Sequence, residues 1–199
     1  VWAVLPVVIA LVVIQEMSAR MGAVTGKGLA DLIRENFGVK ITFYVMLALL
    51  ITNMANTMAE FAGAAAALEI FGISKYITVP VSAFFVWWLV VKGSYRSVEK
   101  VFLIACLFYI AYVISGFMAE PNWQEVGSAA INPSFQFDAP YLYMLVGVIG
   151  TTIAPWMQFY MQASIVEKGI DIETYRQSRW DVWIGCIMAG VVVFFIILA

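Results

Sequence analysis

Four polar side chains recur at helical spacing within one strongly apolar stretch of the sequence. They occupy positions i, i+3, i+4 and i+7, on one face of a helix: Asn53, Asn56, Thr57 and Glu60. Polar groups are costly in an apolar solvent, so such a stripe is a candidate functional site. The alternative is a helix–helix interface held together by amides and small residues. The carboxyl group of Glu60 favours function, because no basic residue lies in the middle of an apolar stretch to pair with it.

A second apolar stretch carries residues that break helices. Its run from Gly147 to Pro155, GVIGTTIAP, places two glycines and two threonines before a proline. A proline inside a helix removes one hydrogen bond and clashes with the preceding turn. We expect the chain to unwind between Thr151 and Ala154, which would free carbonyl oxygens to bind a hard cation. A simple proline kink is the alternative interpretation.

Two glutamines follow this break at helical spacing. Gln158 and Gln162 are four residues apart and face one direction, so they extend the polar track beyond the proline. Gln15 and Glu16 lie near the end of another apolar stretch. Their position indicates a membrane interface, with an inner vestibule as the alternative.

The composition indicates that membrane-spanning helices hold these residues. Of 199 residues, 63% are hydrophobic and 12% are charged, whereas a soluble domain has about 25% charged residues. The net charge of −2 predicts no nucleic-acid partner. The sequence contains no histidine and no nucleophile–base pair, so we expect no enzyme. Cys106 and Cys186 lie in apolar runs, where cysteine behaves as a small hydrophobic residue.

We predict a single all-α transmembrane domain, 1–199, with six spans of roughly 20 mostly apolar residues each. The spans are 1–21, 41–73, 76–91, 98–118, 140–166 and 180–199. Ten of the eleven basic residues fall on one side of this arrangement, and Lys75 is the exception. The ten are Arg20, Lys27, Arg34, Lys40, Lys92, Arg96, Lys100, Lys168, Arg176 and Arg179.

This charge pattern also predicts the orientation of the chain. Basic residues favour the cytoplasmic side, so the start of the first span and the end of the sixth face outward. The expected location is the plasma membrane of a bacterium. Two connections have their own predictions: residues 31–35 form a short amphipathic helix ended by Gly38, and 119–139 is irregular chain at the membrane surface.

Three stretches resemble the NRAMP divalent-metal transporters. The run Gln15 to Gly38, QEMSARMGAVTGKGLADLIRENFG, resembles the second helix of that family and the loop after it, Q-x-x-x-A-R-L-G-x-x-T-G-K-x-L-A-E. Thr57 to Gly63, TMAEFAG, resembles the third helix, D-L-A-E-F-x-G. Gly150 to Pro155, GTTIAP, resembles the broken sixth helix, G-A-T-V-M-P-H. The resemblance covers essentially the whole chain, as family helices two to seven.

Three departures from the family pattern bear on the transported ion. Ala154 stands where the family has a methionine, a soft ligand for manganese and iron, and Trp156 stands where it has a histidine. Thr57 replaces the third-helix aspartate, which the family uses in proton transfer, while its glutamate partner is kept as Glu60. These replacements resemble the NRAMP-related magnesium transporter branch. Magnesium prefers oxygen ligands and keeps several waters, so the loss of a sulfur ligand does not weaken its site.

The resemblance implies a LeuT-type fold, an inverted repeat of five plus five helices. In the family, the first helix supplies an aspartate and an asparagine to the metal through a D-P-G-N motif. That motif is absent here, and the sequence starts and stops within apolar runs. We therefore expect a partial LeuT-type transporter with six transmembrane helices, one of them broken. Its partners would include the missing transmembrane helices of the same protein, the lipid bilayer and divalent metal ions.

The leading hypothesis is a magnesium transporter that works by alternating access without proton coupling. Mg²⁺, or Mn²⁺, would be its substrate, and we expect no resident cofactor. The expected metal ligands are the carbonyl of Thr151, residues around Ala154, and Gln158. The expected polar-track or gating residues are Asn53, Asn56, Thr57, Glu60, Pro155, Trp156 and Gln162. A proton-coupled manganese or iron symporter and a non-transporting membrane scaffold are the alternatives.

Overall fold

The computed structural model of the chain describes residues 1–93, 95–133, 135 and 137–198, without the side chains of residues 95–99 and 102. Two sequence predictions fall outside this description: Ala199 as the end of the sixth span, and the Arg96 side chain in the charge pattern. The described residues form nine helices and no strand. The helices are α1 (Val4–Thr25), α2 (Leu29–Glu69), α3 (Lys75–Lys92), α4 (Tyr95–Cys106), α5 (Tyr109–Met118), α6 (Trp123–Ile131), α7 (Ala139–Thr152), α8 (Pro155–Glu167) and α9 (Tyr175–Leu198).

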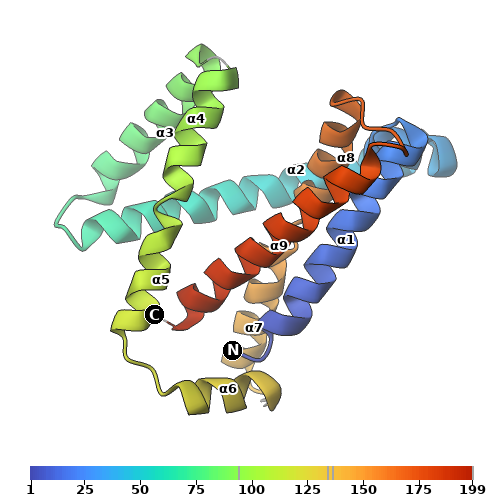
Figure 1. The fold of residues 1–199 in the computed structure, drawn as a ribbon. Helices are drawn as coiled ribbons and strands as arrows, with labels where there is room; N and C mark the ends of the chain where they lie inside the picture. Colours follow the sequence, from blue (N-terminus) through green and yellow to red (C-terminus); the bar gives the residue numbers. More distant parts are fainter. Residues whose placement is uncertain (94, 134, 136, 199) are drawn as a thin grey trace. The chain divides into compact units, whose positions relative to one another are not determined.

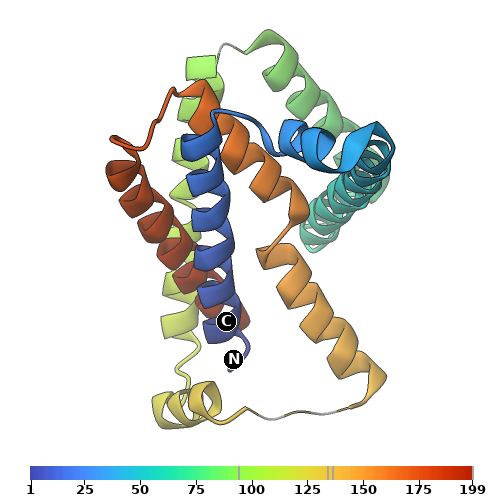
Figure 2. The same cartoon turned by 90° about the vertical axis from the view of Figure 1, so that its right-hand side faces the viewer.

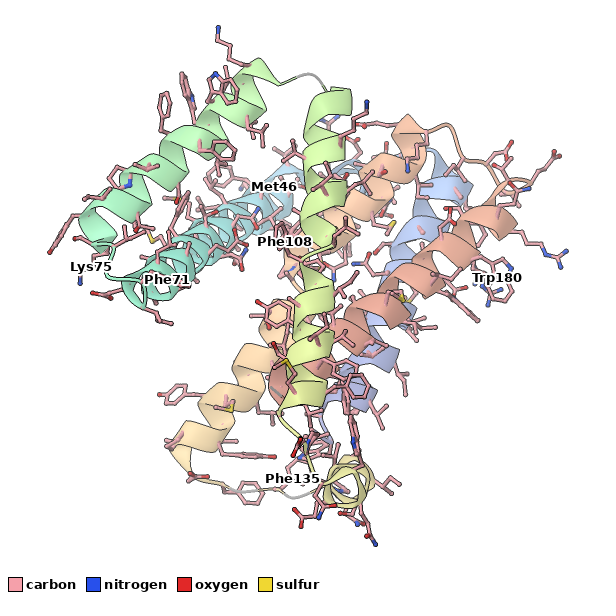
Figure 3. The ribbon with its side chains drawn as sticks, turned by 60° about the vertical axis from the view of Figure 1, so that its left-hand side comes forward. Met46, Phe71, Lys75, Phe108, Phe135 and Trp180 are labelled. Carbon is pink, nitrogen blue, oxygen red and sulfur yellow. The ribbon has the colours of Figure 1, made fainter. Side chains whose placement is uncertain are left out.

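Five of the six predicted spans correspond to helices that are long and apolar enough to cross a membrane. They are α1, α2, α3, the α7–α8 pair and α9. The predicted span 98–118 is instead divided into α4 and α5 by a turn at Leu107 and Phe108, the latter labelled in Figure 3. A sixth crossing would require Leu103–Met118 to join α6, and these two pieces bend by 110° at their junction.

Glycine residues end two helical segments, of which the sequence indicated the one at Gly38. Gly26 has φ +62° at the end of α1, and its N–H donates to the Gly22 carbonyl. Gly38 has φ 82° and ψ 170°, a backbone conformation that residues other than glycine rarely adopt. It divides α2 into a short first helix and a long apolar one. The predicted amphipathic helix that ends at Gly38 is therefore confirmed.

The connection 119–139 differs from the irregular chain that we predicted. It contains α6, which begins where the Asn122 side chain accepts a hydrogen bond from the Gln124 N–H at 3.2 Å. The Asn122 amide also donates to the Glu125 carboxylate at 2.9 Å. Asparagine at this position is a strong helix-starting signal, and the surrounding prolines hid it.

The chain divides into two compact units, and the boundaries fall within α2 and at the start of α5. The first unit contains residues 1–43 and 110–199, and the second contains residues 44–109. The single transmembrane domain therefore stays a prediction. Most large apolar side chains on both units are exposed, as expected for helices that face lipid.

The first unit is built around α1, which lies beside α8 and α9 (Figures 1 and 2). Bare glycines allow this close approach. A Cβ atom on Gly22 would lie 3.0 Å from the Gln162 carbonyl oxygen, and one on Gly190 would lie 2.6 Å from Val8 Cγ2. The core residues of the unit are Leu11, Ala19, Ala23, Ile165, Val182 and Cys186.

The second unit contains the long part of α2, then α3 and α4. A turn after α2 carries Phe71 and leads to α3 near Lys75, both labelled in Figure 3. Ser74 starts α3, because its side chain accepts a hydrogen bond from the Tyr76 N–H. A hollow of about 680 Å³ lies between α2 and α3.

Candidate functional site

The predicted break in the fifth span is present, and it separates α7 from α8 (Figure 2). Only Ile153 and Ala154 leave the helical conformation, with Ile153 at φ −116° and ψ 64° and Ala154 at φ −73° and ψ 137°. The break is therefore shorter than predicted, because Thr151 and Thr152 remain in α7. Pro155 is the first residue of α8 rather than an interior residue, and a proline is tolerated in that position.

The two threonine side chains before the break bond back to their own helix. The Thr151 hydroxyl donates to the Gly147 carbonyl at 2.9 Å, and the Thr152 hydroxyl donates to the Val148 carbonyl at 2.7 Å. These bonds attach both hydroxyls to the preceding turn. The side chains are thus held against α7, and the backbone carbonyls are the groups left to bind a cation or water.

The backbone carbonyls just before the break lack their regular donors. α7 ends with the Ile153 N–H donating to the Ile149 carbonyl at 2.9 Å. Pro155 has no N–H, so the Thr151 carbonyl loses the donor that a continuous helix would supply. Within the described part of the chain, no hydrogen bond reaches the carbonyl of Thr151 or Thr152. Two backbone oxygens are therefore free to bind water or a cation.

Gln158 closes the other side of the break. When its amide nitrogen is turned toward the backbone, it donates to the carbonyls of Ala154 (3.0 Å) and Pro155. The Met157 N–H also donates to the Ala154 carbonyl, at 3.1 Å. The Ala154 carbonyl thus has two donors, and the Ala154 side chain is 7% exposed. Of the three predicted ligands, Thr151 keeps a free carbonyl, while Gln158 and Ala154 contact each other.

Two other predicted residues on α8 have different surroundings. Gln162 is fully buried, and its Nε2 donates to the Lys27 carbonyl at 2.8 Å, which holds α8 against the turn after α1. Its Oε1 is buried without a hydrogen-bond partner among the described residues. Trp156 is partly exposed, and its ring meets the ring of Tyr160 edge to face, with centroids 6.2 Å apart.

Gln15 is a residue that we had assigned to the membrane interface. It is 6% exposed, and its Oε1 has no partner in the described part of the chain. α1 and α8 run in the same direction (Figures 1 and 2), and Gly22 lies against Gln162 and Ile165. Gln15 lies two turns before Gly22 on α1, and its unpaired amide oxygen is buried within the first unit. Its place within the stretch QEMSARMG was the signal for it.

The polar stripe on α2 lies in the second unit, on one helix face as predicted. The Asn56 amide donates to the Glu60 carboxylate at 2.8 Å, and the Thr57 hydroxyl donates to the Asn53 carbonyl at 2.9 Å. The Asn53 side-chain oxygen is buried and has no partner among the described residues. Glu60, for which the sequence offered no basic partner, thus has an amide donor one turn away. Thr57 also lines the hollow between α2 and α3.

The structure accordingly places the predicted residues in two groups, one in each compact unit. The described residues include no group of three or more His, Cys, Asp or Glu side chains that could hold a metal ion. The oxygens available in the first unit are backbone carbonyls and amide oxygens, which suit a hard cation. The family described as Natural resistance-associated macrophage protein-like (Nramp) has a sequence model that matches residues 1–199.

Proposed function

Because this match spans residues 1–199, the chain belongs to the Nramp family, and we propose that magnesium is the main ion it transports. Members of the family are transporters of divalent metals, not enzymes. The family and the long apolar helices make the chain an integral membrane protein.

The backbone at the α7–α8 break carries the proposal for magnesium. The free carbonyl of Thr151 is an oxygen ligand, and Ala154 offers no sulfur to a softer metal. Mg²⁺ requires close to ideal octahedral geometry and gives up water reluctantly, so it is held by few direct ligands and several waters. We infer that the unpaired oxygen of Gln15, which is buried in the same unit, accepts a hydrogen bond from such a water. Mn²⁺ accepts the same ligands and is the second expected substrate.

The proposed mechanism is alternating access without proton coupling, in a LeuT-type arrangement of helices. Thr57 and Trp156 do not titrate near neutral pH, and they replace an aspartate and a histidine, two side chains that could carry protons in the family. The Glu60 carboxylate favours a second candidate, a proton-coupled manganese or iron symporter. In that mechanism Glu60 would take up a proton while its hydrogen bond to Asn56 holds it in place. The start of α1 and the end of α9 would face outward.

Uptake into proteoliposomes tests this proposal. We expect Mg²⁺ influx down its gradient, read with a magnesium dye, and no acidification read with a pH dye in the same vesicles. Glu60→Gln should leave the vesicle pH record unchanged, and Glu69→Gln on the same helix is the matched control. Proton influx that follows metal influx and disappears in Glu60→Gln would establish the symporter instead. No flux of any divalent ion would leave only the membrane scaffold.

A further inference from the structure

The first two turns of α9 carry two arginines and two tryptophans on one face. Arg176, Arg179, Trp180 and Trp183 stand at positions i, i+3, i+4 and i+7, and they line a hollow of about 280 Å³. Trp180, labelled in Figure 3, projects outward and is 59% exposed. The transport mechanism uses none of these residues. Arginine beside tryptophan at the end of an apolar helix is typical of the membrane–water interface.

A carboxylate on α1 fixes half of this surface in place. Glu16 Oε1 lies 2.9 Å from Arg179 Nε, and Glu16 Oε2 accepts a hydrogen bond from Trp183 Nε1 at 2.9 Å. The guanidinium carbon of Arg179 lies 4.6 Å from the Trp183 ring centroid. Glu16 neutralises one of the two arginines. Arg176 has no hydrogen bond or ion pair within the described part of the chain, so its positive charge is free to bind an anion.

An apolar stripe continues from this hollow along α9. Trp180, Ile184, Ile187 and Val191 follow one another at helical spacing, and all four are exposed. The nearest acidic residue on α9, Asp181, lies roughly 200° around the helix from Arg179 and outside the hollow. A cationic hollow that leads into an apolar stripe matches a ligand with an anionic head and a hydrocarbon tail. A free phosphate ion would contact only the cationic hollow and not the apolar stripe.

We propose that this surface binds an anionic phospholipid. The headgroup phosphate lies between the Arg176 guanidinium and the remaining N–H groups of Arg179, because guanidinium groups bind phosphate oxygens in pairs. The glycerol region rests against Trp180, and one acyl chain follows the stripe from Ile184 to Val191. Basic hollows on transmembrane helices near the membrane surface recognise lipid headgroups in this way. The proposal does not depend on which metal the protein carries.

Native mass spectrometry of the full chain in detergent tests the proposal, with phosphatidylglycerol as probe and phosphatidylcholine as reference. We expect phosphatidylglycerol to bind more tightly, and Arg176→Gln to lower its affinity about fivefold, the effect of one basic residue near a membrane surface. Arg176→Lys should retain most of the affinity. Arg34→Gln, which removes an exposed arginine from α2, is the matched control and should change nothing.

Three outcomes would overturn the proposal. They are equal affinity for the two lipids, unchanged phosphatidylglycerol affinity in Arg176→Gln, and an equal loss in Arg34→Gln. A fourth measurement separates a lipid site from a simple anion site. Inorganic phosphate at the lipid concentration should not displace phosphatidylglycerol, and displacement would show that the apolar stripe plays no part.

Discussion

Replacing Gln162 by methionine removes the one amide side chain that is fully buried among the described residues, at nearly constant volume. The hydrogen bond from Nε2 to the Lys27 carbonyl would be lost, at a cost of about 1 kcal/mol. Lys27 is exposed, so water can replace this donor. The buried Oε1 without a partner would also be removed, which relieves about 1–3 kcal/mol. We therefore expect Gln162→Met to stabilise the protein by about 1 kcal/mol.

Thermal unfolding of the detergent-solubilised protein measures this change. For a chain of this size, 1 kcal/mol raises the Tm by about 2–4 °C. Gln177→Met, at an exposed position on α9, is the control and should change stability by less than about 0.5 kcal/mol. Metal uptake should stay close to the native rate, because a fully buried amide does not face an aqueous path.

The reasoning about Gln162 is refuted if the Tm of Gln162→Met falls. A fall would mean that Oε1 has a partner in the working protein, such as an ordered water or a passing cation. Loss of uptake with an unchanged Tm would return Gln162 to the polar track that its spacing from Gln158 predicted.

Pro155→Ala should change stability by less than about 1 kcal/mol, because the proline is the first residue of α8. It should slow uptake about tenfold, the effect of about 1.4 kcal/mol, because the new backbone N–H offers the Thr151 carbonyl a donor. Uptake at the native rate would contradict the carbonyl-ligand mechanism. Gly22→Ala should destabilise the protein by about 1–3 kcal/mol in thermal unfolding, since the new Cβ would lie 3.0 Å from a backbone oxygen of α8; an unchanged Tm would show that the helices separate easily. Hydrogen bonds from the backbone N–H and the hydroxyl three residues on lower the pKa of Asp171, so its stabilising effect is present above its ordinary pKa and is lost as pH falls through the lowered value. The native Tm should therefore fall more steeply than that of Asp171→Asn below about pH 4, and parallel curves would contradict this.

The length of the apolar runs was enough to predict five of the six transmembrane spans, and helix-breaking residues predicted the site of the break. A proline after paired threonines and glycines marked the position, and Gly38 marked the end of the short helix in α2. The length of the break could not be predicted in the same way. Thr151 and Thr152 stay helical, with their hydroxyls bonded back to the preceding turn, and only Ile153 and Ala154 leave the helical conformation.

Contacts between distant segments were the part that the sequence could not supply. Nothing in the spacing of Gln162 indicated that its amide would reach the Lys27 carbonyl, 135 residues away. The partners of Glu16 could not be predicted either, because they lie on α9 and the contact depends on how closely α1 packs against α9. Both contacts depend on helix–helix packing through bare glycines, and the pattern of a single sequence does not predict that geometry. The sequence showed no basic partner for Glu60, and it did not indicate that the Asn56 amide, one turn earlier, donates to the Glu60 carboxylate.

The most direct test of the central claim is the metal preference of the native protein and of Ala154→Met, measured by isothermal titration with Mg²⁺, Mn²⁺ and Cd²⁺. Ala154→Leu is the matched control, because both side chains crowd the same buried position and only methionine adds sulfur. We expect Ala154→Met to gain about tenfold in Mn²⁺ and Cd²⁺ affinity over Ala154→Leu, about 1.4 kcal/mol, and to bind Mg²⁺ more weakly than the native protein. Identical metal preferences in the two variants would remove Ala154 from the metal site and contradict a magnesium-selective break between α7 and α8.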